Sequence, residues 1–381
     1  MAGGLVGTAF PVRFFNDIRV LFAIFVIASC RLISQGELTS NHPDVPDVSY
    51  GSCTSFCLHN HGYALFCSNY DNQIKEGILF VNKRHVGKSG LDESTTGEKA
   101  QWISKYGSVT FSLIGNQHVW AGMNEKGLVI STMALRGTKV HEPDERPPLS
   151  SGYWVQYILD QCKTIEEVIE AKSAIRMGET VDHYLVCDRY GNTAIIEWLD
   201  GKIVHHTGHS VPVKCLTNNR YKDLVDGWKR DEKLDFLENE EKGSIYRFRI
   251  AADRVSRFRS KNSKKAINYA FRTLEKVAGS YTQWSIVFNT EKLQIHFHTK
   301  THPHVRIVNL MDFDFSCNTP VMLLDIHEKL SGDVTEEFKI YTSDYHIDYL
   351  GRALRRWGVD MTPEMVKSLS AFLDSFPCKQ D

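Results

Sequence analysis

Short apolar runs separated by turn residues dominate the chain from residue 53 to about residue 135. The runs predict β-strands at Thr54–Leu58, Tyr63–Ser68, Ile78–Asn82, Ser108–Ile114 and Leu128–Met133. Turn residues at 60–62 (Asn-His-Gly) and 124–127 (Asn-Glu-Lys-Gly) divide them. Because such turns join neighbouring strands that run in opposite directions, this region is predicted to form antiparallel hairpins.

The pattern then changes to apolar residues spaced three and four apart, which predicts a helix over Tyr153–Arg176. Within it, Thr164 followed by Glu167 has the spacing of a capping box, which would restart the helix at that point. Further on, we expect strands at Tyr184–Cys187, Thr193–Trp198 and Lys202–Thr207, then helices at Tyr246–Phe258 and Ala266–Val277, and a hairpin of Gln283–Asn289 with Lys292–His298.

A last helical segment, Asp344–Trp357 and Thr362–Phe376, is expected to cap one end of the molecule. The order of elements along the chain is sheet, helices, sheet, helices, sheet. We therefore predict an α+β fold in which two antiparallel sheets pack face to face with helices outside.

Composition changes this picture little. The chain has 381 residues, 42% of them hydrophobic, and its 45 lysines and arginines nearly balance 46 aspartates and glutamates. No overall field would attract nucleic acid, so a substrate must be recognised locally. The basic stretch Arg247–Lys265 contains phenylalanines, but its apolar positions keep helical spacing and favour a solvated helix face over a nucleic-acid patch.

The N-terminal residues resemble an export signal. Arginines at positions 13 and 19 precede an apolar run of about 10 residues that ends in small residues, which is too short for the roughly 20 needed to span a bilayer. We predict a signal peptide at 1–29. Residues Ile27-Ala28-Ser29-Cys30 also resemble a bacterial lipobox, so Cys30 is either a lipid-modified membrane tether or an incidental cysteine after an ordinary signal.

Residues 30–52 are polar and show neither helical nor strand periodicity, and we interpret them as a tether or pro-segment. The folded domain would then occupy 53–381.

Nine cysteines are an odd number for an exported chain, which indicates at least one working thiol. Cys162, Cys187 and Cys215 fall in apolar patterns and are expected to be buried and structural. Cys57 and Cys67 lie on neighbouring predicted strands and are candidates for a disulfide. The spacing does not give the paired C-x-x-C ligands of a zinc site.

Five stretches together resemble the choloylglycine hydrolase and penicillin V acylase family of linear-amide hydrolases, over roughly residues 53 to 300. They are Cys53-Thr54-Ser55-Phe56, Asn69-Tyr70-Asp71, the run 121–128 (Ala-Gly-Met-Asn-Glu-Lys-Gly-Leu), Leu216-Thr217-Asn218 and Tyr246-Arg247-Phe248. The resemblance implies a four-layer αββα sandwich of the N-terminal-nucleophile superfamily. It implies no metal or organic cofactor.

The resemblance assigns chemical roles to particular residues. Once the chain begins at Cys53, its free α-amine can take the proton of its own thiol, since the ordinary pKa of an α-amine is near 8. Asp71 would hold that amine, and the positive charge of Arg247 would favour the thiolate. Asn218 would donate to the oxyanion of the tetrahedral intermediate, and the backbone N–H of Ala134 would be the second donor.

Two departures from the family pattern bear on the substrate and on processing. Ser68 stands where relatives carry an arginine, and the interval from Cys53 to Asp71 is one residue shorter, which weakens the case for penicillin V or conjugated bile acids in particular. The residues before Cys53 also require that the Ser52–Cys53 bond be cut, by a late signal cleavage or by Cys53 itself.

We therefore predict an exported bacterial amidase that hydrolyses a small acyl amide through an acyl-thioester on Cys53. Its acyl pocket would be formed by loops such as Asp71–Gly77 and Arg136–Leu149. Penicillin V, conjugated bile salts, N-acyl homoserine lactones and N-acyl amino acids all remain compatible. Relatives are often tetramers, so a homo-oligomer is open as well.

Two alternatives stay open. One is a non-catalytic surface lipoprotein that keeps the fold and is never processed, and the other is a cysteine peptidase that uses Cys53 with a distant histidine.

Two weaker signals are rejected. Val86-Gly87-Lys88-Ser89 ends like a phosphate-binding loop, but Asn82 replaces its first glycine. Seven histidines lack a carboxylate at ligand spacing, so we expect exposed strand residues instead of a metal site. They are His205, His206, His209, His296, His298, His302 and His304.

Overall fold

The computed structural model describes residues 52–60, 63–90, 99–113, 115, 118–135, 137–140, 142–178, 182–230, 239–260, 262–356, 361–373 and 376–379. The predicted signal peptide at 1–29, Cys30 and nearly all of the predicted pro-segment lie outside these residues. None of the described helices is long and apolar enough to cross a membrane.

The first large sheet, sheet A, has seven strands in the order β14-β1-β2-β15-β16-β17-β19. The strands are β1 (Thr54–Asn60), β2 (Tyr63–Asp71), β14 (Cys215–Leu216), β15 (Thr282–Asn289), β16 (Gln294–Thr299), β17 (Arg306–Asn309) and β19 (Gly332–Asp333). All pairs are antiparallel except β17 with β19. Strand β1, which follows Cys53 directly, therefore lies between β2 and β14, and these are the strands that lead to Asp71 and to Asn218.

The second large sheet, sheet B, has nine strands in the order β13-β12-β11-β8-β7-β6-β3-β18-β20. They are β3 (Ile78–Asn82), β6 (Ser108–Ser112), β7 (Val119–Asn124), β8 (Val129–Ala134), β11 (Asp182–Cys187), β12 (Thr193–Leu199), β13 (Lys202–Thr207), β18 (Met322–Asp325) and β20 (Lys339–Ile340). Every pair is antiparallel. Two small sheets pair β4 (Gly87–Ser89) with β5 (Gln101–Ile103) and β9 (Pro148–Leu149) with β10 (Arg176–Met177).

Aromatic side chains fill the space between the two large sheets. Phe111 of sheet B meets Phe288 and Phe297 of sheet A edge to face, with ring centroids 6.1 and 5.6 Å apart. Phe66 meets Phe288 in the same way at 6.0 Å. All four rings are fully buried. Edge-to-face contacts of this kind add to the free energy of area burial, so this layer holds the sheets together.

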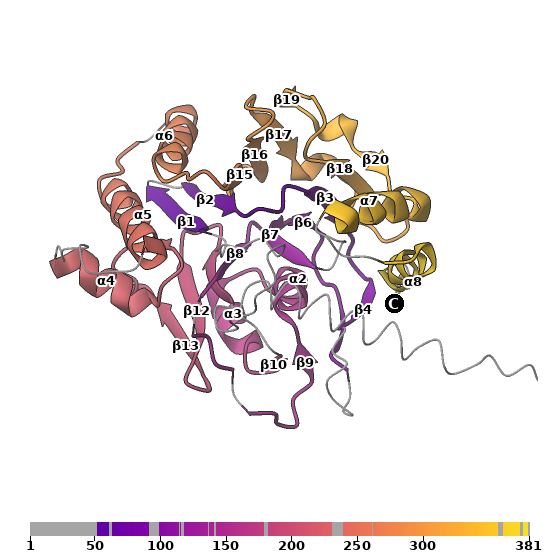
Figure 1. Ribbon diagram of the computed structural model, residues 1–381, viewed down its shortest axis with the longest axis horizontal. Helices are drawn as coiled ribbons and strands as arrows, with labels where there is room; N and C mark the ends of the chain where they lie inside the picture. Colours follow the sequence, from indigo (N-terminus) through magenta and orange to yellow (C-terminus); the bar gives the residue numbers. More distant parts are fainter. Residues whose placement is uncertain are drawn as a thin grey trace, which may run out of the picture.

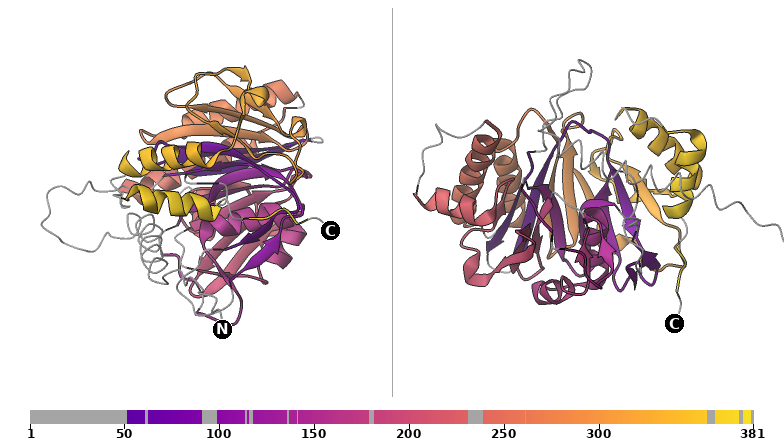
Figure 2. Two further views of the ribbon diagram at one scale, coloured as in Figure 1. Left: turned by 90° about the vertical axis from the view of Figure 1, so that its right-hand side faces the viewer. Right: turned by 60° about the horizontal axis from the view of Figure 1, so that its bottom comes forward.

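Helices cover the outer faces (Figures 1 and 2). The helices are α2 (Ser151–Gln161), α3 (Ile165–Ala171), α4 (Tyr221–Arg230), α5 (Asn239–Ser256), α6 (Ser263–Lys276), α7 (Ser343–Arg356) and α8 (Pro363–Leu373), with 3₁₀ turns at Gly208–Ser210, Leu310–Asp312 and Thr335–Glu337. Helices α5 and α6 pack on sheet A, and α2 packs on β7 and β8 of sheet B. The molecule is therefore an αββα sandwich, as predicted.

The C-terminal helices α7 and α8 pack against each other on the side of the molecule away from α5 and α6 (Figure 1). Leu350, Leu354 and Leu369 form a small core there with Ile78 and Phe80 of β3. A disulfide between Cys317 and Cys378 ties the end of the chain back to the body. The prediction that this helical pair caps one end is confirmed.

Most predicted elements are present, with local corrections. The predicted helix over Tyr153–Arg176 is two helices, and Thr164 restarts the second by accepting a hydrogen bond from the Glu167 N–H at 3.3 Å. The prediction is wrong at its end, because α3 stops at Ala171 and Arg176 pairs with Pro148 in a parallel strand. The turn at 124–127 is confirmed, and Gly127 adopts a φ of 81° that residues with a side chain rarely adopt.

The prediction of a Cys57–Cys67 disulfide is wrong, and the strand register gives the reason. Cys57 lies opposite Phe66 and Cys67 lies opposite Phe56. Because directly opposed residues share a face and neighbours alternate, the two thiols point to opposite faces of sheet A. Both are free and buried, and so are Cys162, Cys187 and Cys215, as expected of structural cysteines.

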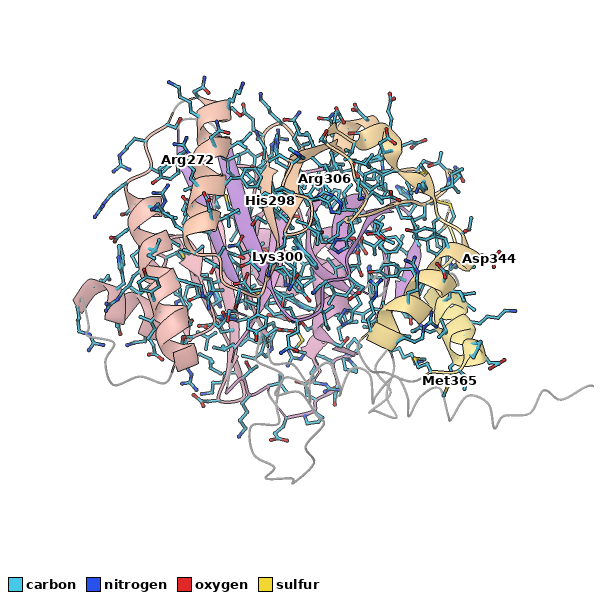
Figure 3. The ribbon with its side chains drawn as sticks, turned by 45° about the horizontal axis from the view of Figure 1, so that its top comes forward. Arg272, His298, Lys300, Arg306, Asp344 and Met365 are labelled. Carbon is cyan, nitrogen blue, oxygen red and sulfur yellow. A yellow bond between two sulfur atoms is a disulfide. The ribbon has the colours of Figure 1, made fainter. Side chains whose placement is uncertain are left out.

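The expectation that the strand histidines are exposed is correct only in part. His205, His209 and His304 are exposed, but His296 is only 6% exposed. His298, labelled in Figure 3 near Arg272 of α6, is half-buried and packs on Phe271 with ring centroids 5.3 Å apart. The period-2 pattern located these side chains on one face of β16, but that face lies toward α6.

Candidate active site

Cys53 precedes the first strand of sheet A and is 5% exposed. In the β1–β2 pair, Thr54 lies opposite Asn69 and Ser55 lies opposite Ser68, and extending this register by one residue places Cys53 opposite Tyr70, on the same face as Ser55 and Ser68. Ser68 also contacts Ser131 of sheet B at 3.3 Å between hydroxyls, which identifies this as the face between the sheets. The thiol is therefore enclosed at one end of the inter-sheet layer.

The surroundings of Cys53 make it a poor nucleophile within an uncut chain. Burial, and next the Asp71 carboxylate, raise the pKa of the thiol to about 12, although the Asp71 backbone N–H and Arg247 oppose this. At pH 7 only about one thiol in 10⁵ would then be ionised. Since the thiolate is the reactive species, an adjacent base is needed.

Arg247, on α5, connects two parts of the site. Its Nη1 donates to the carbonyl oxygen of Cys53 at 2.6 Å and to the hydroxyl of Thr54 at 2.8 Å. Its Nη2 donates to Oδ1 of Asn218 at 3.1 Å. Arg247 is 8% exposed, so it brings a fixed charge to the Cys53 thiol and sets the orientation of the Asn218 amide.

Asp71 ends β2 and is 1% exposed. Its Oδ1 accepts a hydrogen bond from the Thr282 hydroxyl at 2.6 Å, and its backbone oxygen accepts from the Ser52 N–H at 3.2 Å. The other carboxylate oxygen, Oδ2, is buried and has no hydrogen-bond partner among the residues that the structure describes. Burial raises the pKa of Asp71 to about 6, against the lowering effects of Arg247 and Thr282.

Asn218 follows β14, and its side chain reaches across to sheet B. Its Nδ2 donates to the carbonyl oxygen of Ala134 at 2.8 Å, and its backbone N–H donates to the Ser244 hydroxyl at 2.9 Å. Thr217 is hydrogen-bonded to Ser244 as well. Because Arg247 holds Oδ1, the amide presents its N–H₂ group toward the end of β8.

The structure thus brings together all five residues that the sequence singled out. Arg247 links Cys53 to Asn218, Asn218 contacts Ala134, and the charge of Asp71 acts on both Cys53 and Arg247. The contact at Ala134 is made by its carbonyl, whereas the predicted oxyanion donor is its N–H. The catalytic roles remain predictions.

Sequence reasoning missed three residues that support the site, namely Thr54, Ser244 and Thr282. Each contributes a hydroxyl to the hydrogen bonds described above. No motif marked them, because a serine or threonine at a strand start or on a helix is common. Only the fold shows that Thr282 and Asp71, more than 200 residues apart, are opposed in register.

Ser68 occupies the position at which the resembling family has an arginine. Its hydroxyl lies 2.7 Å from that of Ser55, in addition to the Ser131 contact. Three neutral hydroxyls therefore stand where a charge would be, and Arg247 is the cation that acts on the thiol.

Comparison with known proteins supports the resemblance that the sequence shows. A family model described as linear amide C-N hydrolases, choloylglycine hydrolase family, matches residues 53–225. The penicillin V acylase of Pectobacterium atrosepticum is 26% identical over 319 residues, which cover 70% of this chain and 82% of that protein.

Solved structures give the same answer for the fold. The penicillin V acylase of Agrobacterium tumefaciens superposes with a TM-score of 0.66 at 25% identity, covering 76% of this chain and 98% of that one. The conjugated bile acid hydrolase of Clostridium perfringens superposes with a TM-score of 0.59 at 18% identity, covering 73% and 98%.

The layered α+β sandwich is therefore that of the N-terminal-nucleophile hydrolases. Within that class, the chain resembles the choloylglycine hydrolase and penicillin V acylase family, and it is a hydrolase of carbon–nitrogen bonds in linear amides other than peptide bonds.

Proposed function

We propose that this chain is an exported amidase whose nucleophile is the thiol of an N-terminal Cys53, formed when the Ser52–Cys53 bond is cut. The observation that carries the proposal is the unpaired, buried Oδ2 of Asp71 beside Cys53. A buried carboxylate oxygen without a donor costs free energy. A free α-ammonium on Cys53 would supply that donor, and its conjugate amine would supply the base that the thiol lacks.

The mechanism follows from these positions. The α-amine takes the thiol proton, and the thiolate attacks the carbonyl carbon of the amide. The resulting oxyanion is stabilised by the Asn218 side chain and by the backbone N–H of Ala134. The leaving amine takes a proton from the α-ammonium and departs, and water then hydrolyses the acyl-thioester.

A cysteine–histidine mechanism has less support. No histidine is hydrogen-bonded to Cys53 within the described residues, and none is among the groups that perturb the pKa of its thiol. The α-amine is thus the base that best fits the site.

Aromatic residues next to Cys53 support an apolar acyl group. Tyr70, opposite Cys53 by register, stacks on Trp284 with ring centroids 4.0 Å apart, and Trp120 meets it edge to face at 5.0 Å. The loop after Asp71 is fixed at both ends, since Gln283 donates to the Asn72 oxygen at 2.6 Å and the Ile326 N–H donates to the Gly77 oxygen at 3.2 Å. Such a rigid loop suits the wall of an acyl pocket.

Export is part of the same proposal. The Cys317–Cys378 disulfide supports it, because disulfides persist in oxidising compartments. The signal-like N-terminus supports it as well, and Cys30 would then be a lipid tether. Cell fractionation of the full chain beside Cys30→Ala tests both points. Export with loss of membrane attachment in the variant is expected, and a cytoplasmic wild-type chain would refute the proposal.

Penicillin V is the first substrate to test, because two relatives act on it by name. Conjugated bile salts and N-acyl amino acids complete the panel. Purified mature protein should release the amine from at least one of them, and Cys53→Ala should not. Cys57→Ala is the matched control, since it removes a buried thiol four residues further along the chain, on the same face of sheet A. Equal loss of activity in both variants would argue against Cys53 as the nucleophile.

A further inference from the structure

Glu197, on β12, is a fully buried carboxylate outside the residues assigned so far. Its Oε1 accepts the backbone N–H of Tyr221 at 2.9 Å and lies 3.2 Å from Nδ1 of His183. Its Oε2 lies 3.5 Å from Nε2 of His206, an ion-pair distance. Burial by itself would raise the pKa of Glu197, but the two imidazoles and the Tyr221 N–H lower it to about 2. The carboxylate is therefore charged at every working pH.

The hydrogen bond to Tyr221 places this charge next to the active site. Tyr221 begins α4, three residues after Asn218. Its hydroxyl donates to the Val213 oxygen at 2.7 Å, and its ring packs on His206 with centroids 5.1 Å apart. The segment 218–221 is thus held by Ser244 at its start and by Glu197 at its end. Two fixed ends restrict where the side chain of Asn218 can reach.

The same carboxylate also reaches the partner of Asn218. His183 lies opposite Met133 in the β8–β11 pair, and its neighbour Asp182 lies opposite Ala134. The Ala134 carbonyl accepts the Asn218 amide. Glu197 therefore contacts the segments on both sides of the Asn218–Ala134 hydrogen bond. It accepts the Tyr221 N–H on the Asn218 side and contacts His183, on the strand paired with β8, on the Ala134 side.

We propose that Glu197 is a positioning residue for amide hydrolysis, which holds the Asn218 side chain where it can stabilise the oxyanion. This rests on the proposed role of Asn218 in the site described above. Glu197 touches no reacting atom, and it acts through the backbone of Tyr221 and the imidazole of His183.

Kinetics of the mature enzyme test the proposal. Glu197→Ala should lower kcat about 10-fold to 100-fold, the scale of an ångström-sized misplacement, and leave KM within about threefold. Glu197→Gln keeps an acceptor for the Tyr221 N–H and should recover most of the rate. Asp160→Asn is the control, because Asp160 is another fully buried carboxylate, paired with Lys88 at 2.8 Å and held by Trp102, outside the site.

A double-mutant cycle separates positioning from stability. If Glu197 acts through Asn218, Glu197→Ala should cost little further activity in an Asn218→Ala background. The proposal is overturned if the two losses multiply, or if Glu197→Ala and Asp160→Asn lower thermal stability alike and neither changes kcat.

A crystal structure of Glu197→Ala gives a readout that does not depend on activity. We expect the Asn218 amide to leave the Ala134 oxygen, and an unchanged contact near 2.8 Å would refute the positioning role even if no substrate is found. An inactive wild-type enzyme with a displaced Asn218 in the variant would instead count against the proposed function alone.

Discussion

Replacing Asn218 by alanine separates the proposed oxyanion stabilisation from all other roles of the site. The substitution removes the amide that donates to Ala134 and accepts from Arg247. The backbone N–H of residue 218 still donates to the Ser244 hydroxyl, and Arg247 still donates to Cys53 and Thr54. The proposed nucleophile and its proposed base are therefore preserved.

The expected loss in kcat/KM is about 100-fold to 1,000-fold, which corresponds to about 2.7–4 kcal/mol of transition-state stabilisation. The cost to folding is smaller. Two partly buried hydrogen bonds of about 1 kcal/mol each are lost, so the free energy of unfolding should fall by about 2 kcal/mol. The variant should fold and still react with thiol reagents at Cys53.

Amine release from the best substrate of the panel is the assay, with active sites counted by covalent labelling of Cys53. Asn262→Ala is the control for stability, since it removes the amide that caps α6 through the Lys265 N–H at 2.9 Å. Such a cap contributes about 1 kcal/mol. The control should keep full activity.

Asn218→Asp refines the test. It keeps an oxygen for Arg247 and nearly the same shape, but it cannot donate to an oxyanion. It should therefore be as slow as the alanine variant. Activity of Asn218→Ala within about threefold of wild type, or recovery of the rate in Asn218→Asp, would refute the reasoning.

Three further outcomes follow from the same geometry. Thr282→Val removes a hydrogen bond that lowers the pKa of Asp71. Such a bond to a charged group contributes about 1.5–3 kcal/mol, so the acid limb of the pH–rate profile should shift to higher pH by about one to two pH units, while the rate at alkaline pH stays the same. Asp71→Asn should abolish hydrolysis yet raise the melting temperature of the uncut chain at pH 7.5. Folding raises the pKa of Asp71 from 3.8 to about 6, so the native state binds more protons than the unfolded state between these pH values, and the free energy of unfolding falls by up to about 3 kcal/mol as pH rises through them. The neutral asparagine side chain removes this loss of stability. An unchanged melting temperature would contradict the raised pKa. Cys317→Ser with Cys378→Ser should lower stability by about 2–4 kcal/mol in unfolding experiments and leave kcat unchanged, whereas equal stability with and without reductant in the wild type would show that this disulfide is absent.

Strand and helix periodicity predicted most of the fold, and its failures have physical causes. Strand β7 was not predicted because Ala121 and Gly122 at its centre are poor strand formers. Helix α4 was not predicted because few of its ten residues are apolar, and only four of the ten residues are buried. The Cys57–Cys67 error came from knowing the neighbouring strands without knowing the register.

For the site, the sequence supplied residue types in a recognisable order, and the fold supplied the contacts. Asp71 could be proposed from its place after Asn69-Tyr70, but its unpaired oxygen could not. Glu197 carried no signal, because a glutamate in an apolar strand normally indicates an exposed edge. Its hydrogen bond from the backbone N–H of Tyr221 can be recognised only from the folded structure.

Intact mass and N-terminal sequencing of the protein, expressed in full beside Cys53→Ala, tests the central claim most directly. We expect wild-type chains that begin at Cys53 and hydrolyse an acyl amide. Wild-type chains that retain Ser52 and still turn over the amide would contradict the account, because the α-amine would then be blocked and the base would have to be another group.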